Sequence, residues 1–332
     1  MANFSEKVRR TSKAVAEDVR RDLTYFTPGL AVAHTVGDLP LRGKFLRPAA
    51  DWAGRKKDRE ILSYLEKTYG DVLRGADREW KPIKEEYHPA EAPIWICWLQ
   101  GEEEAPPLVK RCIASIRRNA GRHPVHLLTQ ADLSFYIHLP PYILEKYHRQ
   151  MIGAAHFSDV VRVMVLQKYG GLWLDATIFC TAAIPNQYFE REFFSCKGPV
   201  RESRYISHYR WTTFVLGGRP GGKIYTLLKC FFEHYWEREQ AAIDYLFMDY
   251  AIELLYRLFS DVKNEIDALP ENNLERDNLA AYMGRPFSQE RWDTFLTADT
   301  GLYKLSWREK WAEKMESGED TFFGYFLKDM EK

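Results

Sequence analysis

The chain has 332 residues, 45% of them hydrophobic, and carries 47 basic and 47 acidic side chains. With no net positive charge, the protein as a whole would not attract nucleic acid, so nucleic-acid binding is not expected. No apolar run reaches the roughly 18–20 residues that span a bilayer. The N-terminus also lacks the apolar core of a secretory signal, so we expect a cytoplasmic protein.

Two features of the composition bear on function. The chain contains 10 Trp, 19 Tyr and 19 Phe, and flat rings of this kind stack on sugars or nucleobases as well as filling a core. The five cysteines form no CxxC pair and their number is odd. This pattern argues against a disulfide framework or a zinc ribbon and favours reduced intracellular thiols.

Residues 1–90 are predicted to form a helical extension. Apolar residues recur at helical spacing over 1–24 and 58–75, whereas three prolines interrupt the stretch 25–50. Residues 1–60 carry 13 Lys or Arg against 8 Asp or Glu. This basic end is either a solvated surface or a contact with a partner or with the anionic inner face of a membrane.

From residue 94 onward, short apolar runs alternate with helical patterns. The run IWICWL (94–99) has the character of a buried strand, and a helix at 108–119 and a strand at 125–129 follow it. Another helix ends near residue 149. Strands and helices that alternate at this spacing predict an α/β protein with a sheet of parallel type.

The segment HFSDVVRVMVLQKYGGLWLDATIFC (156–180) is the most informative part of the chain. Ser158 can cap a helix whose apolar residues cover nearly every direction, so the helix should be buried. Asp159 and Arg162 lie three residues apart and share a face of that helix. They form either a local ion pair at a partly exposed edge or a polar pair directed into a ligand crevice.

The same segment predicts an abrupt change from helix to strand. Gly170 and Gly171 suit the end of a helix, because glycine tolerates the left-handed conformation there. A short strand, Leu172–Leu174, then leads to Asp175. An acidic residue in this position either caps a turn or binds a metal or a sugar, since α/β sheets bind ligands at the ends of their strands.

Later elements are predicted with fewer functional signals. The pattern favours strands at 193–196, 212–216 and 302–307, helices at 223–237 and 244–259, and a final helix after the last strand. Asp244 is either a helix cap on a solvated face or a group in the site. Trp307 either closes over a ligand or packs in the core.

The pattern SDVVRVMVLQKYGGLWLDATIF closely resembles the capsular polysaccharide synthesis family and the wider group of glycosyltransferases with a DXD region. Proteins of this group share an SD-x-x-R helix that leads to YGG, a short apolar and aromatic run, and Asp. The upstream IWICWLQG is similar to their first strand, and DYLFMDY and YKLSW are similar to their later segments. The resemblance covers about 94–310.

The resemblance implies a GT-A type fold over residues 91–332, with a nucleotide-binding α/β sheet flanked by helices. It also implies hexosyl transfer from a nucleotide sugar, most simply a UDP-sugar, with retention at the anomeric carbon. The acceptor would be a capsular polysaccharide of the cell surface or its lipid-linked precursor. The residues expected at the site are Trp95, Trp98, Asp159, Arg162 and Trp307 for donor binding, and Asp175 and Asp244 for catalysis.

One departure from the family pattern concerns the metal. Asp175-Ala176-Thr177 lacks the second carboxylate of DXD, which leaves Asp175 and the Thr177 hydroxyl to hold Mn²⁺ or Mg²⁺ with phosphate oxygens and water. Such a cation would stabilise the departing nucleoside diphosphate. Two alternatives stay open: an inactive donor-binding scaffold, suggested by the single carboxylate, and a sugar-phosphate transferase that releases a nucleoside monophosphate.

Overall fold

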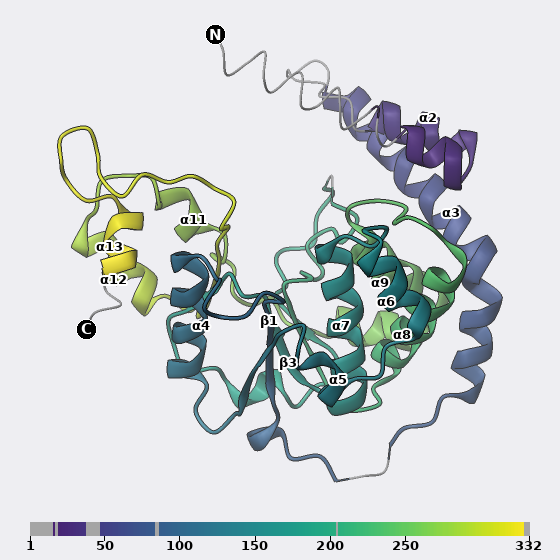
Figure 1. Ribbon diagram of the computed structural model, residues 1–332, viewed down its shortest axis with the longest axis horizontal. Coiled ribbons are helices and arrows are strands. Elements are labelled where there is room, and N and C mark those ends of the chain that lie inside the picture. The colour runs from purple at the N-terminus through teal and green to yellow at the C-terminus, as the bar shows by residue number, and fades with distance from the viewer. Residues whose placement is uncertain (1–15, 17–18, 38–46, 84–85, 204, 329–332) are drawn as a thin grey trace.

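The computed structural model describes residues 16, 19–37, 47–83, 86–203 and 205–328 (Figure 1). Its strands are β1 (Ile94–Cys97), β2 (Val125–Leu128), β3 (Gly171–Leu174), β4 (Ile178–Cys180), β5 (Phe194–Ser195), β6 (Val215–Gly218) and β7 (Leu302–Lys304). Its longer helices are α2 (Pro28–Gly37), α3 (Arg47–Glu79), α4 (Pro107–Asn119), α6 (Pro141–His148), α7 (Ala154–Tyr169), α8 (Lys223–Arg238), α9 (Phe247–Leu258), α10 (Ser260–Asp267) and α12 (Gln289–Thr297). Shorter helices are α5 (Leu133–Tyr136), α11 (Asn278–Tyr282) and α13 (Phe322–Lys328).

A mixed five-stranded sheet forms the centre of the described structure, in the order β2-β1-β3-β6-β5. The first three strands are parallel, as the sequence predicts, but β6 runs antiparallel to both β3 and β5. A parallel connection needs a crossover of a dozen or more residues, usually a helix. Within the described residues, no α-helix lies between β3 and β6. The predicted α/β class is therefore confirmed, and the predicted parallel arrangement holds for β1, β2 and β3 but not for β5 and β6.

Buried apolar side chains hold the central strands of this sheet against the helices that cover them. Ile94 and Ile96 of β1 and Leu172 and Leu174 of β3 are fully buried. In Figure 1, α4 lies on one side of these strands and α7 on the other. Because both faces are covered, the strands are continuous apolar runs and do not alternate between apolar and polar residues.

The N-terminal region packs on the rest of the protein through α3, which runs along one side of the molecule in Figure 1. Ile61, Leu65 and Leu73 of this helix are fully buried in the same hydrophobic core as the sheet. The helix predicted at 58–75 is confirmed and is longer. The irregular stretch predicted at 25–50 is wrong in part, because Pro28 begins α2, a position where proline loses no helical hydrogen bond. Most of the helix predicted at 1–24 lies outside the described residues.

The C-terminal region returns to the sheet through β7. This strand pairs antiparallel with β4, so that Lys304 lies opposite Ile178. Beyond β7 the chain is irregular until α13, so the predicted final helix exists but does not follow the strand directly. In Figure 1, helices α11, α12 and α13 form a group at the end of the molecule opposite α3.

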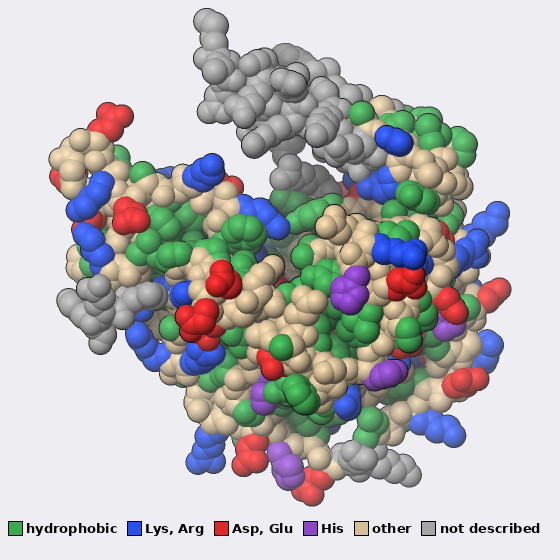
Figure 2. All heavy atoms as spheres, in the orientation of Figure 1, with side chains coloured by type: hydrophobic (Ala, Val, Ile, Leu, Met, Phe, Trp, Pro, Cys, Tyr) green, Lys and Arg blue, Asp and Glu red, His purple; other side chains and the backbone are tan. Residues whose placement is uncertain are grey.

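The surface shows no concentration of one charge on the face drawn in Figure 2, where acidic and basic side chains are interspersed among apolar patches. Among the described residues, no helix is both long enough and apolar enough to cross a membrane. All five cysteines lie in the described part of the chain and are free thiols.

Candidate active site

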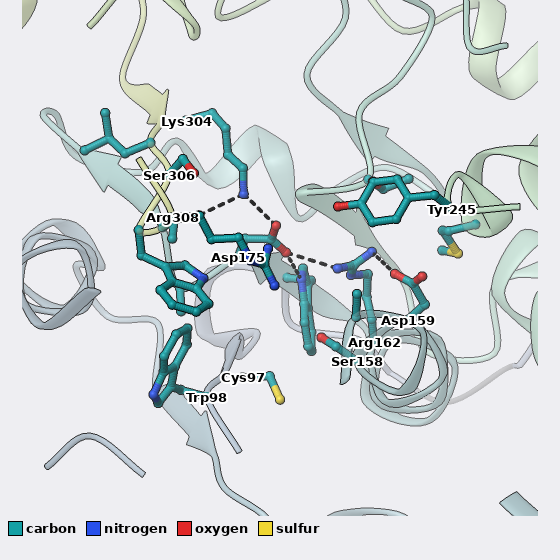
Figure 3. Close-up of a pocket in the computed structure, with 18 of the residues that line it drawn as sticks. Cys97, Trp98, Ser158, Asp159, Arg162, Asp175, Tyr245, Lys304, Ser306 and Arg308 are labelled. Carbon is teal, nitrogen blue, oxygen red and sulfur yellow. Dashed lines mark hydrogen bonds and ion pairs between the residues drawn. The ribbon is translucent and has the colours of Figure 1, made fainter. Parts of the chain in front are cut away.

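A cavity of about 360 Å³, lined by both charged and apolar side chains, opens at the carboxyl ends of β1 and β3. Because these strands are parallel, Trp98 and Asp175, which follow them, lie at the same edge of the sheet. Helix α7, Thr213, the start of α9, and the end of β7 with the chain after it complete the wall (Figure 3). The structure thus brings together residues from six separate segments at the position where α/β sheets bind ligands.

The turn between α7 and β3 explains how Asp175 reaches this edge. Gly170 and Gly171 have positive φ angles of 65° and 92°. A Cβ atom on Gly171 would lie 2.1 Å from the carbonyl oxygen of Pro93, and the adjacent Leu172 N–H donates to that same oxygen at 2.9 Å. The two glycines therefore let β3 enter directly beside β1, as the sequence predicts.

Helix α7 supplies the polar pair predicted from the sequence. It begins at Ala154 with Gly153 at the N-cap, so the cap predicted at Ser158 is wrong: two alanines, which are strong helix formers, extend the helix by a turn. Ser158 instead lines the cavity. Arg162 Nη1 donates to Asp159 Oδ1 at 2.8 Å, and both side chains line the cavity. The pair is therefore both a local ion pair and part of the crevice.

Asp175 is the centre of the charged network. Its Oδ1 accepts from Arg162 Nη2 and from Trp173 Nε1, each at 3.0 Å. Its Oδ2 accepts from Lys304 Nζ at 2.8 Å. Burial of the carboxyl raises its pKa, but the charges of Lys304 and Arg162 outweigh that effect and hold the pKa at about 2. Asp175 is therefore a carboxylate at every pH at which the protein would work.

Lys304 belongs to this network, although no pattern in the sequence predicts it there. Its Nζ donates to Asp175 Oδ2 and to Thr177 Oγ1, both at 2.8 Å. These are the two oxygens predicted to hold a metal, and in this arrangement they do not fit one, because a protein cation already joins them. Among the described residues, no group of three or more His, Cys, Asp or Glu could hold a metal. Only the pairing of β4 with β7 places Lys304 there, and no local pattern signals it.

The aromatic residues predicted to bind the donor divide into two groups. Trp98 and Trp307 line the cavity, with ring centroids 5.7 Å apart and planes at 86°. Trp95 does not line it. This residue is 2% exposed, its ring stacks on His126 and its Nε1 donates to Gly170 O. Its place in the structure is the core, since it lies inside β1, whereas Trp98 lies past the end of that strand.

Two carboxylates lie near the start of α9: Asp244, which the sequence predicts at the site, and Asp249. Asp249 lines the cavity, where its Oδ1 accepts from Trp211 Nε1 at 2.9 Å. Burial raises the pKa of Asp249 to about 7. Asp244 does not line the cavity; its Oδ2 is paired with Lys57 and His34 of the N-terminal helices. The structure thus places Asp249 on the cavity wall beside Asp159 and Asp175, and places Asp244 outside it.

Two donors at the cavity have no partner among the described residues. Arg162 Nε and Trp98 Nε1 are buried without a hydrogen bond. Buried donors are nearly always satisfied, and exceptions call for an explanation such as a missing ligand or water. Both groups belong to side chains of the cavity wall, which supports its assignment as a binding site.

The fold and this cavity define an α/β protein whose candidate ligand site lies at the carboxyl ends of its parallel strands. The chain belongs to the family described as capsular polysaccharide synthesis protein, whose sequence model matches residues 47–326. The matched region includes the cavity and all of α3, so it crosses the predicted boundary between a helical extension and a catalytic domain at residues 90 and 91.

Two individual proteins are similar over part of the chain. The O-glycosyltransferase braB of Annulohypoxylon truncatum is 26% identical over 163 residues, which cover 46% of this chain and 36% of that protein. The chain therefore spans little more than a third of the length of this curated relative. Among solved structures, the PaToxG glycosyltransferase superposes with a TM-score of 0.37 and 13% identity, covering 64% of this chain and 83% of that chain.

Proposed function

We propose that the protein transfers a sugar from a nucleotide-activated donor to a hydroxyl acceptor. The observation that carries this proposal is the network of Asp159, Arg162, Asp175 and Lys304 on one wall of the cavity. It lies in a chain that belongs to the capsular polysaccharide synthesis family and resembles a curated O-glycosyltransferase. The network combines cations that attract a diphosphate with carboxylates that accept hydrogen bonds from sugar hydroxyls.

Each part of the cavity has a role in this proposal. Arg162 and Asp159 orient the donor sugar, since a buried, paired guanidinium has a fixed direction. Trp98 and Trp307 form an aromatic edge that contacts the base of the nucleotide. Asp249, on the wall nearest α9, faces the acceptor and holds its hydroxyl. Asp175 fixes the two cations around it.

The finer features of the reaction are part of the same proposal. The family resemblance supports a UDP-hexose donor, retention at the anomeric carbon, and a capsular polysaccharide or its lipid-linked precursor as acceptor. A lipid-linked acceptor would agree with peripheral attachment at the inner face of the membrane through the basic N-terminus, most of which lies outside the described residues. The Mn²⁺ or Mg²⁺ predicted from the DXD resemblance stays a prediction, and no step proposed here depends on it.

Two alternatives are separated from this proposal by the products formed. Purified protein is first screened for thermal stabilisation by nucleotide sugars with and without Mn²⁺, because a ligand stabilises the state that it binds. The stabilising donor is then incubated with acceptor oligosaccharides, and the products are resolved by chromatography. A nucleoside diphosphate supports glycosyl transfer, a nucleoside monophosphate supports sugar-phosphate transfer, and binding without turnover supports the scaffold.

Asp175→Asn tests the proposed site directly. We expect transfer to fall by about 10²–10³-fold, because a neutral amide no longer holds Arg162 and Lys304 in place for the charge that develops on the leaving group. Initial rates and circular dichroism are measured on the same preparation. Asp71→Asn, which changes a fully exposed carboxylate of α3, should leave the rate unchanged. If a folded Asp175→Asn protein kept full transfer activity and full donor binding, the proposed function of this site would be contradicted.

A further inference from the structure

Lys304 occupies the position at which a DXD-type site would hold its metal. Its ammonium nitrogen lies 2.8 Å from Asp175 Oδ2 and 2.8 Å from Thr177 Oγ1. These distances are those of charge-assisted hydrogen bonds and exceed the 2.0–2.1 Å of Mg²⁺ to oxygen. Figure 3 shows the amino group of Lys304 directed at Asp175, on the cavity side of β7.

The backbone holds this lysine in place. Lys304 is paired with Ile178 across β4 and β7. Its own N–H donates to Arg276 O at 2.8 Å, and the N–H of the next residue, Leu305, donates to Thr177 O at 3.0 Å. The start of its side chain is therefore fixed by backbone hydrogen bonds to two neighbouring segments. A lysine anchored in this way loses little further freedom when a ligand binds, unlike one on a mobile surface loop.

Asp175 has little capacity left for a metal. A carboxylate offers about four lone-pair sites, and Trp173, Arg162 and Lys304 together take three of them. A divalent cation at the remaining site would also lie beside two positive side chains, whose repulsion opposes its binding. The arrangement therefore favours the lysine over a metal at this carboxylate.

The same lysine keeps the capacity to bind an anion. An ammonium group has three N–H donors, of which Asp175 and Thr177 accept two. The Lys304 side chain is 27% exposed and lines the cavity, together with Arg308. One N–H and two positive charges are thus available at the wall where the diphosphate of a donor would lie.

We infer that Lys304 takes the place of the divalent cation and binds the diphosphate of the donor, so that transfer proceeds without a metal. The inference rests on the proposed function and deepens it. In the transfer step, the bond between the anomeric carbon and the β-phosphate oxygen breaks and its electron pair stays on that oxygen. The acceptor oxygen forms the new bond to the anomeric carbon, and its proton passes to a phosphate oxygen of the departing diphosphate. Lys304 stabilises the charge that develops there.

The test measures the affinity for UDP and for GDP by isothermal titration calorimetry, in EDTA and in Mn²⁺. The wild-type protein should bind one of these nucleotides in EDTA, with a Kd that changes less than about twofold in Mn²⁺. Lys304→Met should bind about tenfold or more weakly in EDTA, the loss of one charge-assisted contact. It should also gain dependence on Mn²⁺, because the oxygens of Asp175 and Thr177 are then uncovered.

Two further variants keep the test decisive. Lys304→Arg retains a cation and should keep most of the affinity in EDTA, which would show that a loss in Lys304→Met does not come from misfolding. Lys310→Met removes an exposed lysine of the same segment and should bind like the wild type. Wild-type binding that requires Mn²⁺, or unchanged binding by Lys304→Met in EDTA, overturns the inference alone. Absence of binding of nucleotides and nucleotide sugars in both buffers overturns the proposed function and the inference with it.

Discussion

Two clusters of charged side chains in the protein are alike in composition but differ in their position relative to the cavity. The site cluster consists of Asp159, Arg162, Asp175 and Lys304. The clasp cluster consists of Asp22, His34, Lys57 and Asp244. Each joins two carboxylates to two basic groups from distant parts of the chain. Removing charges from water is costly in both, and mutual pairing offsets that cost.

The clusters differ in their access to a cavity. In the site cluster, the side chains of Asp175 and Lys304 are each 27% exposed and line the cavity. In the clasp cluster, Asp22 and His34 are almost fully buried, and His34 bridges the two carboxylates with one ring nitrogen each. Both clusters contain buried charge, and only the site cluster lies beside an open cavity among the described residues.

The clasp cluster links the N-terminal helices to the part of the protein that carries the cavity. His34 belongs to α2 and Lys57 to α3, whereas Asp244 lies just before α9. Burial alone would lower the pKa of His34, but hydrogen bonds to Asp22 and Asp244 raise it to about 9. Next to Asp244, Tyr245 and Leu246 line the cavity. The clasp thus holds Asp244 directly beside two residues of the cavity wall, while none of its own four side chains lines the cavity.

The largest effect on stability is expected from removing His34, the side chain that joins the two carboxylates of the clasp cluster. His34→Ala should lower the free energy of unfolding by about 3–5 kcal/mol, because it leaves two buried carboxylates without their shared partner. Urea unfolding measures this loss, and calorimetry on the folded variant measures the Kd of the nucleotide. We expect that Kd to stay within about twofold of the wild type. His148→Ala, at an exposed position of α6, should change stability by less than about 0.5 kcal/mol.

The pH dependence of the free energy of unfolding tests whether the loss in His34→Ala comes from the charged histidine. A histidine whose pKa is raised on folding adds stability that is complete below its unfolded pKa of 6.5 and is lost as the pH rises through about 9. The wild-type protein should therefore lose up to about 3 kcal/mol between pH 6.5 and pH 9.5, and His34→Ala should not. If the free energies of unfolding of the two proteins changed with pH in the same way, the charged pairing of His34 in the clasp cluster would be contradicted.

Much of the site cluster could be predicted because its signals are local. Asp159 and Arg162 share a helix face, and Gly170, Gly171 and Asp175 follow in one short segment, so spacing alone brings them to one edge of a sheet. The α/β class follows from the same alternation of strand and helix. The cavity confirms that these three charged residues lie together.

The remaining residues depend on contacts that no local pattern contains. Lys304 lies 129 positions after Asp175, and only the β4–β7 pairing brings them together. Asp244 and His34 are 210 positions apart, so the acidic residue before α9 gave no sign of its buried partner. Trp95 and Trp98 are both in one apolar run, and only the end of β1 decides which of them faces the cavity.

A smaller effect on stability is expected from replacing Asp249, a carboxyl of the cavity wall whose pKa is raised. Because burial raises its pKa from 3.8 to about 7, its contribution to stability is complete below pH 3.8 and is lost as the pH rises through 7. Asp249→Asn removes this loss while its amide oxygen can still accept from Trp211. The variant should therefore become more stable than the wild type by about 1–2 kcal/mol between pH 5 and pH 8, a value reduced because water reaches the wall. A stability difference that is constant with pH in thermal melts would contradict this assignment.

The smallest effect is expected at the rim of the site cluster, where Trp307 is 43% exposed and meets Trp98 edge to face. Trp307→Ala should weaken nucleotide binding by about fivefold, close to 1 kcal/mol, because an open aromatic contact is worth less than a buried charge. Trp52→Ala removes a similarly exposed ring from α3 and should leave the Kd unchanged. If Trp307→Ala and Trp52→Ala changed the Kd of the nucleotide equally, Trp307 would not contact the nucleotide. Binding would then depend on the charged wall alone.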